Sequence, residues 1–259
     1  MTVVVWFCYS PAVDFTRTRV AALLRERGIS LKRSLGQNYL VDANFLDALV
    51  RDAEIGPDDA VVEIGSGLGN LTERLAARAA RVWAFEIDEQ IHALSKELVG
   101  GVPGITLLRA DGADFARHVE GPRIKIVSNL PYGDWQKILL AILAAPQEIA
   151  SCTLMIQADV FDRMRAEPGT KEYGPMPALL QATSTLKKLR QAGKGLFLPA
   201  PRVESTVFRL TRPRPVEDAV RVEARLRELF VQRRKKSAAA GGRRVEQLPP
   251  AELLALARR

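Results

Sequence analysis

The chain has 259 residues, enough for one large domain or for one domain with a small appendage. Hydrophobic residues make up 47% of it, so it can bury a sizeable core, and its net charge of +8 makes a polyanion such as a nucleic acid a candidate partner. Its two cysteines, Cys8 and Cys152, form no disulfide framework and fit a reducing cytoplasm. The apolar opening segment 1–9 is too short to span a bilayer and lacks the layout of a secretory signal, so we expect a short strand or an unfixed tail there.

The first part of the chain predicts two helices separated by a loop. Residues 14–27 have helical spacing and good helix-forming residues. The polar segment 31–42 contains Gly36 and is typical of a loop. Asp42 is a plausible N-cap for a second helix over 43–53.

Strands and helices alternate from there on. Five apolar runs have the pattern of buried strands, namely 60–65, 81–88, 104–111, 123–131 and 151–157. Helices are expected after four of them, over 70–79, 89–98, 135–145 and 158–166. Two later segments, 183–191 and 204–211, resemble a hairpin. This alternation predicts a Rossmann-like α/β fold, with a mostly parallel sheet, helices on both faces and a late antiparallel hairpin.

The sequence pattern changes at Arg212, where the alternation of strands and helices ends. Residues 212–215 (RPRP) are typical of a linker, and 216–259 read as a small, very basic helical piece. We therefore expect an N-terminal extension with a helix over 1–30, the main domain over 31–212 and a small basic helical domain over 213–259.

A glycine-rich turn follows the first predicted strand. Gly65, Gly67 and Gly69 let the backbone turn tightly and approach a ligand without side-chain clash. Glu63 directly precedes this turn, and the spacing is G-x-G-x-G rather than the G-x-G-x-x-G of dinucleotide-binding domains. A carboxylate at that strand end would serve a pyrophosphate poorly and suits an ammonium group better.

Two more acids stand at predicted strand ends. Glu86 closes the second strand, where a carboxylate can accept both ribose hydroxyls, and Asp111 ends the third, where it can accept a hydrogen bond from an adenine amine. Either acid alone could be an ordinary polar residue at a strand end. The ordered set, with Glu63, favours a nucleoside with a cationic sulfonium side, and therefore S-adenosylmethionine.

The fourth strand ends in Asn129-Leu130-Pro131-Tyr132, which suits methyl transfer to an adenine amine. The amine's lone pair is delocalised into the ring, and the Asn129 side-chain oxygen and the Leu130 carbonyl can accept its hydrogens and orient it. Pro131 fixes the direction of that carbonyl, and Tyr132 offers a flat face for the base. A flipped or single-stranded base is expected as the target. An ordinary turn after a strand is the alternative.

Phe197 lies in a later Leu-Phe-Leu-Pro-Ala-Pro run and could cover the other face of the adenine. A contact within the hydrophobic core explains the same residue equally well. His92 and His118 have no metal-ligand spacing, and no metal is expected.

Five segments together resemble the ribosomal RNA adenine dimethyltransferases of the KsgA type, namely Gln37–Leu40, Glu63–Gly69, Asn129–Tyr132, Phe197–Ser205 and Gln232–Lys235. The resemblance extends from about Leu31 to the C-terminus. It implies a class I methyltransferase fold and conversion of two adjacent adenosines near the 3′ end of 16S small-subunit ribosomal RNA to N6,N6-dimethyladenosine. It also implies S-adenosylmethionine as cofactor and a role in small-subunit biogenesis. We expect a cytoplasmic monomer.

The resemblance also assigns residues by position. It implies that the cofactor contacts Asn38, Leu40, Gly65, Glu86, Asp111 and Asn129. It implies that the target adenine is held by Asn129, Leu130, Tyr132 and Phe197.

Two departures from the family's pattern stand out. Gly133-Asp134-Trp135 replaces a small polar run beside the predicted target pocket, which bears on how the base enters. The segment after Gln232 is shorter than usual by about a helix, which bears on affinity for the ribosomal substrate.

Basic residues gather near the C-terminus, where we expect RNA phosphates to bind: Arg225, Arg227, Arg233, Arg234, Lys235, Lys236, Arg243 and Arg244. We call these residues the basic cluster. A solvated basic face is the alternative.

Three other functions stay open on the sequence alone. Relatives that methylate large-subunit RNA and confer macrolide resistance share the fold and a similar tetrapeptide, although Leu130 and the Phe197–Ser205 run favour the small-subunit type. The altered segment 133–135 and the shortened tail also fit a mainly non-catalytic ribosome assembly or RNA-binding factor. A methyltransferase for small molecules or proteins fits the basic cluster less well.

Overall fold

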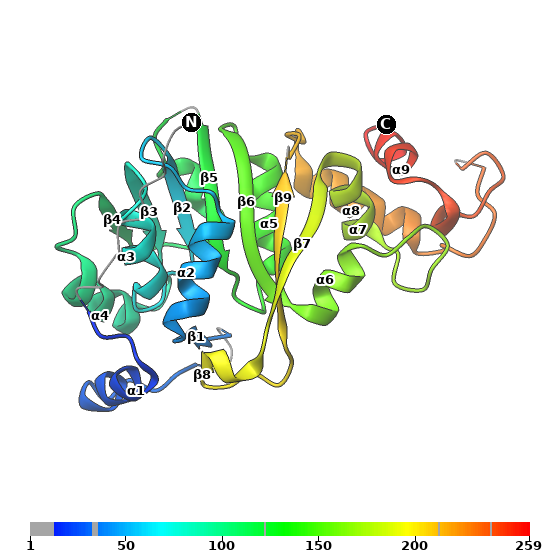
Figure 1. The fold of residues 1–259 in the computed structure, drawn as a ribbon. Helices are drawn as coiled ribbons and strands as arrows, with labels where there is room; N and C mark the ends of the chain where they lie inside the picture. The colour runs from blue at the N-terminus through cyan, green and yellow to red at the C-terminus, as the bar shows by residue number, and fades with distance from the viewer. Residues whose placement is uncertain (1–12, 33–35, 122, 212, 239) are drawn as a thin grey trace, which may run out of the picture.

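The computed structural model describes residues 13–32, 36–121, 123–211, 213–238 and 240–259. A seven-stranded sheet in the order β4-β3-β2-β5-β6-β9-β7 lies at its centre (Figure 1). Five neighbouring strands are parallel: β2 (Ala60–Ile64), β3 (Arg81–Phe85), β4 (Ile105–Leu108), β5 (Arg123–Asn129) and β6 (Glu148–Gln157). Strand β9 (Ser205–Thr211) pairs antiparallel with β6 and with β7 (Thr185–Ala192). The predicted mostly parallel sheet with a late antiparallel hairpin is confirmed.

The two faces of the sheet are both covered. Val61 and Val62 are fully buried neighbours on β2, and they belong to different hydrophobic clusters because successive strand residues point to opposite faces. The cluster of Val61 includes residues of α2 (Ala43–Asp52) and α3 (Asn70–Ala76). The cluster of Val62 includes residues of α5 (Trp135–Ala144). A third cluster joins α1 (Arg17–Glu26) to α4 (Glu89–Val99).

The N-terminal elements agree with expectation except at one point. Asp42 caps α2, because its side chain accepts a hydrogen bond from the Phe45 amide at 2.8 Å. Within the segment predicted as a loop, however, β1 (Tyr39–Leu40) pairs antiparallel with β8 (Phe197–Leu198). This pairing depends on a partner remote in sequence, so local pattern could not reveal it. The predicted strand or tail over 1–9, with Cys8, lies outside the described residues.

Further helices lie after β4 and after β6. Helix α6 (Ala158–Met164) was expected, whereas the 3₁₀ helix η2 (Gly112–Arg117) and helix α7 (Pro175–Thr183) were not. Helix α7 begins at a proline, which the first turn tolerates because amides there have no intrahelical partner.

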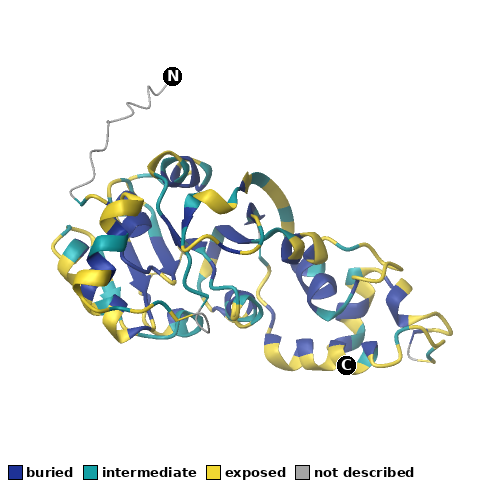
Figure 2. Cartoon of the chain, turned by 90° about the horizontal axis from the view of Figure 1, so that it is seen from below, coloured by how far each residue is buried: buried dark blue, intermediate teal, exposed yellow. Residues whose placement is uncertain are grey.

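The C-terminal region contains α8 (Ala219–Phe230), the 3₁₀ helix η4 (Val245–Gln247) and α9 (Pro250–Ala257). These helices gather beside α7, and their buried residues lie on their inner sides (Figures 1 and 2). Leu226 and Leu253 are fully buried and belong to the same hydrophobic cluster as Leu139 of α5. The core therefore runs on from the sheet into this region.

Arg214, in the segment expected to be a linker, and Val216, just after it, each form a backbone hydrogen bond to a preceding helix. The Val216 amide donates to the Leu143 carbonyl at 2.8 Å, and the Arg214 amide donates to the Thr183 carbonyl at 2.9 Å. The division of the chain into 1–30, 31–212 and 213–259 stays a prediction. Among the described residues, no helix is both long enough and apolar enough to cross a membrane.

Candidate active site

A cavity lies at the carboxyl ends of β2, β3 and β5, where the strand order switches direction. Its wall contains every residue predicted to bind the cofactor, together with Leu130, predicted to hold the target adenine, and Pro131, predicted to fix the direction of the Leu130 carbonyl. These residues are Asn38, Leu40, Glu63, Gly65, Gly67, Glu86, Asp111 and Asn129, with Leu130 and Pro131. The fold therefore brings most of the predicted site together at one edge of the sheet.

The glycine turn forms one wall of the cavity. The amides of Gly65 and Ser66 both donate to the Phe85 carbonyl, at 2.8 and 2.9 Å, which anchors the turn to β3. Gly67 has a φ of 57°, in the left-handed region that favours glycine. A Cβ at Gly67 would lie 2.7 Å from Cε1 of Tyr39, so the tyrosine ring packs directly on the turn. A side chain there would displace the ring or the turn.

Glu86 lies at the end of β3 with only 8% of its surface exposed. Its two carboxylate oxygens accept from the amides of Gly67, at 3.0 Å, and Asp88, at 2.8 Å. Burial raises the pKa of Glu86, and the two backbone donors oppose that rise. Each oxygen still has a lone pair for a further donor. The carboxylate is thus held in place with capacity for two hydroxyl groups.

Glu63 is buried at the end of β2 and accepts a hydrogen bond from the Thr72 hydroxyl at 2.6 Å. Burial raises the pKa of Glu63 to about 8, against the effect of the Thr72 hydrogen bond and with a contribution from the charge of Glu86. A cation bound nearby would favour the ionised carboxylate. Glu63 therefore suits a positively charged group in the cavity.

Asp111 caps η2, its Oδ1 accepting from the Ala113 amide at 2.9 Å. Its Oδ2 forms an ion pair with Lys137 on α5. Burial would raise the pKa of Asp111, but the hydrogen bonds from Lys137 and Ala113 outweigh it, and the net pKa is lowered. Nothing in the sequence pattern had singled out Lys137, because its partner is brought to it only by the fold.

Asn129 ends β5, and only one of the two polar atoms of its side chain forms a hydrogen bond within the described ranges. Its Nδ2 donates to the Asn38 carbonyl at 3.1 Å, which ties the N-terminal segment to the strand end. Its Oδ1 is buried and has no hydrogen-bond partner among the described residues. Leaving a buried acceptor unsatisfied costs about 1–3 kcal/mol. Such a group in a cavity wall marks a place for a ligand's donor.

Sequence reasoning missed two further groups in this wall. The hydroxyls of Tyr39 and Ser66 are buried and lack a hydrogen-bond partner in the described part of the chain. Tyr39 lies beside the glycine turn because β1 pairs with the remote β8, whereas Ser66 belongs to the turn itself.

Tyr132 and Phe197 do not line the cavity. Tyr132 is half-buried, and its hydroxyl shares a hydrogen bond with Ser205 at 3.0 Å. Phe197 is fully buried in a hydrophobic cluster with Leu40 and Val207, which is the core contact considered as its alternative role. Stacking on a base would require the Phe197 ring to become accessible, so this role stays a prediction.

Comparison with known proteins decides the family. The model of the ribosomal RNA adenine dimethylase family matches residues 28–245. The chain belongs to this family. It is 42% identical over 235 residues to the ribosomal RNA small subunit methyltransferase A of Moorella thermoacetica, covering 85% of this chain and 82% of that protein. It is 36% identical over 231 residues to the protein of the same name from Bacillus cytotoxicus, covering 85% and 79%.

Solved structures agree with this assignment. The chain has a TM-score of 0.68 to a dimethyladenosine transferase from Plasmodium falciparum, at 21% identity, covering 83% of this chain and 94% of that one. Its TM-score to the 23S rRNA methyltransferase ErmE is 0.60, at 28% identity, covering 85% and 98%. The fold is that of a class I methyltransferase.

The cofactor of this chain is S-adenosylmethionine. The cavity fits it in two respects. Gly65 lines the cavity without a side chain, in space where a Cβ would meet only Pro131 Cδ at 3.5 Å and the Asn129 carbonyl oxygen at 3.9 Å. The strand-end carboxylates, with the Asn129 Oδ1 that has no partner among the described residues, offer acceptors to a nucleoside that carries hydroxyl, amine and ammonium donors. No group of three or more His, Cys, Asp or Glu side chains placed to hold a metal occurs among the residues that the structure describes.

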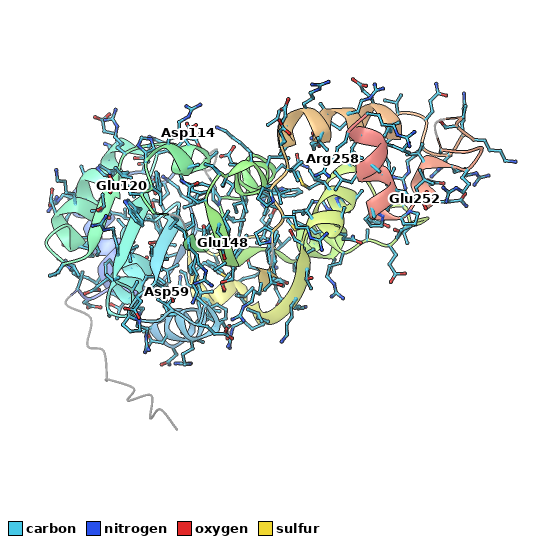
Figure 3. All side chains as sticks on the ribbon, turned by 90° about the horizontal axis from the view of Figure 1, so that it is seen from above. Asp59, Asp114, Glu120, Glu148, Glu252 and Arg258 are labelled. Carbon is cyan, nitrogen blue, oxygen red and sulfur yellow. The ribbon has the colours of Figure 1, made fainter. Side chains whose placement is uncertain are left out.

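The basic cluster divides into two halves. Four of its arginines pair with carboxylates, namely Arg225 with Glu228, Arg227 with Glu223, Arg233 with Glu246 and Arg243 with Glu252. Glu252 is labelled in Figure 3, on the C-terminal helices. The other four, Arg234, Lys235, Lys236 and Arg244, are exposed and have no carboxylate partner in the described ranges. These four, here called the unpaired basic group, can meet a phosphate without first breaking an ion pair.

Proposed function

We propose that this protein transfers methyl groups from S-adenosylmethionine to the N6 amines of two adjacent adenosines near the 3′ end of 16S small-subunit ribosomal RNA, giving N6,N6-dimethyladenosine. The observation that carries the proposal is the buried, unpartnered Oδ1 of Asn129 in a cavity whose strand-end acids suit a nucleoside. The names of the relatives at 36–42% identity support the small-subunit substrate.

Each acid at a strand end contacts a different part of the cofactor. Glu86 accepts hydrogen bonds from the ribose hydroxyls, Asp111 accepts one from the adenine amine, and Glu63 favours the ammonium end. The remaining proposed contacts form the wall around them, namely Asn38, Leu40, Gly65, Gly67 and Asn129. When bound, S-adenosylmethionine supplies a methyl group on a cationic sulfur, open to in-line displacement by a nucleophile.

The chain's contribution to transfer is orientation of the target amine. The Asn129 side-chain oxygen and the Leu130 carbonyl accept the two amine hydrogens, so that the nitrogen lone pair points away from the ring's π system. Pro131 restricts the backbone that holds this carbonyl. Tyr132, fixed by Ser205, offers a face to the base. Positioning of this kind can lower a barrier by several kcal/mol, up to about 7–11 kcal/mol in well-oriented systems.

The substrate that we infer is the immature small ribosomal subunit. The unpaired basic group supplies the phosphate contacts, with the paired arginines of the basic cluster joining where RNA competes for their carboxylates. We infer a cytoplasmic protein that acts as a monomer in small-subunit biogenesis.

One experiment tests the activity directly. Purified small subunits that lack the modification are incubated with the protein and labelled cofactor, and the RNA is then digested for nucleoside analysis. Label in N6,N6-dimethyladenosine is expected, together with its absence in the Asn129→Ala variant. Full rescue of a deletion strain by Asn129→Ala would instead favour a non-catalytic assembly factor.

A second candidate is methylation of large-subunit RNA, favoured by the similarity to ErmE over 85% of this chain. Primer extension on both ribosomal RNAs distinguishes the two. Stops at adjacent adenosines of the 16S RNA are expected, and stops in the 23S RNA alone would make the second candidate right.

A further inference from the structure

The ion pair between Lys137 and Asp111 joins two elements beside the cavity. Asp111 follows β4 and lines the cavity, whereas Lys137 lies in the first turn of α5. The Lys137 side chain is 58% exposed and the Asp111 side chain 32%, and ion pairs this exposed contribute little to stability. Stability is therefore a poor explanation for the pair.

Both oxygens of the Asp111 carboxylate are anchored. Oδ1 accepts from the Ala113 amide and Oδ2 from the Lys137 ammonium. A carboxylate offers about four lone-pair positions. With two of them engaged from different elements, the carboxylate cannot turn freely, and its remaining positions are available to a donor in the cavity.

Other charges around Lys137 also favour its ammonium form. The hydrogen bond to Asp111 is the largest influence that raises the pKa of Lys137, and the charges of Asp114 and Asp134 add to it. Asp114 lies on η2, is labelled in Figure 3, and is shared with Arg117 at 3.4 Å. Asp134 lines the cavity. Lys137 therefore remains a cation among three carboxylates and contacts the one at the predicted adenine position.

The position of Lys137 also links the two halves of the site. Helix α5 begins at Trp135, after two residues that follow the segment Asn129–Tyr132, and the Asp134 amide donates to the Pro131 carbonyl at 3.3 Å. One turn into the helix, Lys137 reaches back to Asp111. The segment proposed to hold the target adenine is thus tied to the acid proposed to hold the cofactor adenine.

We propose that Lys137 is a positioning residue for the cofactor, which holds the Asp111 carboxylate so that its free lone pairs meet the adenine amine. This inference rests on the proposed function, in which Asp111 accepts a hydrogen bond from that amine. Lys137 acts only through Asp111.

The test measures binding of S-adenosylhomocysteine and of its inosine analogue, S-inosylhomocysteine, by calorimetry. We expect Lys137→Met to raise the Kd for S-adenosylhomocysteine by about tenfold, in the range of coupling between contacting residues. The same variant should also have a smaller preference for S-adenosylhomocysteine over the inosine analogue, which has a carbonyl where adenine has its amine. Lys137→Arg should restore both values to within about threefold, because it keeps the cation. Lys187→Met, which removes an exposed lysine of β7, should change neither value.

A double mutant separates positioning from other roles. Because Lys137 acts through Asp111, Asp111→Asn with Lys137→Met should bind no more weakly than Asp111→Asn alone. A raised KM for RNA with an unchanged Kd for S-adenosylhomocysteine would make Lys137 a phosphate contact and overturn the inference. If Asp111→Asn weakens binding but Lys137→Met does not, the inference is wrong and the role of Asp111 stands. If Asp111→Asn binds normally, the role of Asp111 in the proposed function is wrong as well.

Discussion

The two polar atoms of the Asn129 side chain have different surroundings. Its Nδ2 is occupied by the Asn38 carbonyl, and its Oδ1 is free for the target amine. We expect Asn129→Ala to lower kcat by about 100-fold or more, as loss of one preorganised polar group does in other enzymes. The Kd for S-adenosylhomocysteine should rise only a few-fold. Equal losses in kcat and in cofactor affinity, measured by methyl transfer and calorimetry, would contradict the assigned role.

The buried carboxyl of Glu63 should make the free energy of unfolding depend on pH. Its pKa is about 8 in the folded protein and near 4.5 when exposed, because burial disfavours the carboxylate. Between these values the folded state binds a proton that the unfolded state lacks, so Glu63 lowers the free energy of unfolding as pH rises. Glu63→Gln removes this loss. Urea denaturation at pH 5 and at pH 8.5 gives the free energy of unfolding of both proteins. The value for the variant minus that for the wild type should be about 4 kcal/mol higher at pH 8.5 than at pH 5. A constant difference would show that Glu63 ionises normally.

At the scale of elements, the sequence predicts the strands and helices whose pairing follows from the local pattern of residues. The runs that became β2 to β6 are apolar and regularly followed by helices, so the parallel sheet and its ligand-binding edge could be predicted. The pairing of β1 with β8 and the ion pair of Asp111 with Lys137 could not, because each joins residues that only the folded chain brings together. The same reason explains why Phe197 could not be assigned to the core or the pocket by pattern.

Gly112 of η2 packs closely against Ile64 of β2. A Cβ at Gly112 would overlap Cγ2 of Ile64, and the two elements are too close for either to yield easily. Gly112→Ala should lower the free energy of unfolding by about 1–3 kcal/mol and weaken cofactor binding, because Asp111 is its neighbour. Gly101→Ala is the matched control, since a Cβ there meets nothing within 4 Å. Chemical denaturation of both variants measures the difference, and equal stability would show that η2 can shift away.

At the scale of the whole molecule, charge and packing act together in the C-terminal region. The hydrophobic core continues into α8 and α9, so these helices hold their surface residues in a defined place relative to the cavity. Much of the positive charge seen in the sequence is nevertheless balanced locally, since half of the basic cluster forms ion pairs with neighbouring carboxylates. Net charge therefore overstates the phosphate-binding surface, and the unpaired basic group should dominate it.

Removing two members of the unpaired basic group should change the salt dependence of RNA binding. Each phosphate contact contributes about 0.7–0.9 to the slope of log K against log salt concentration, so Lys235→Ala with Lys236→Ala should reduce the slope by about 1.5. A control with the same change in net charge is Arg25→Ala with Lys96→Ala, on α1 and α4 at the opposite end of the sheet (Figure 1). Filter binding to a small-subunit RNA fragment over a tenfold salt range gives both slopes. If the two double variants lose the same slope, long-range charge rather than local contact attracts the RNA, because only a local contact depends on where the charge lies.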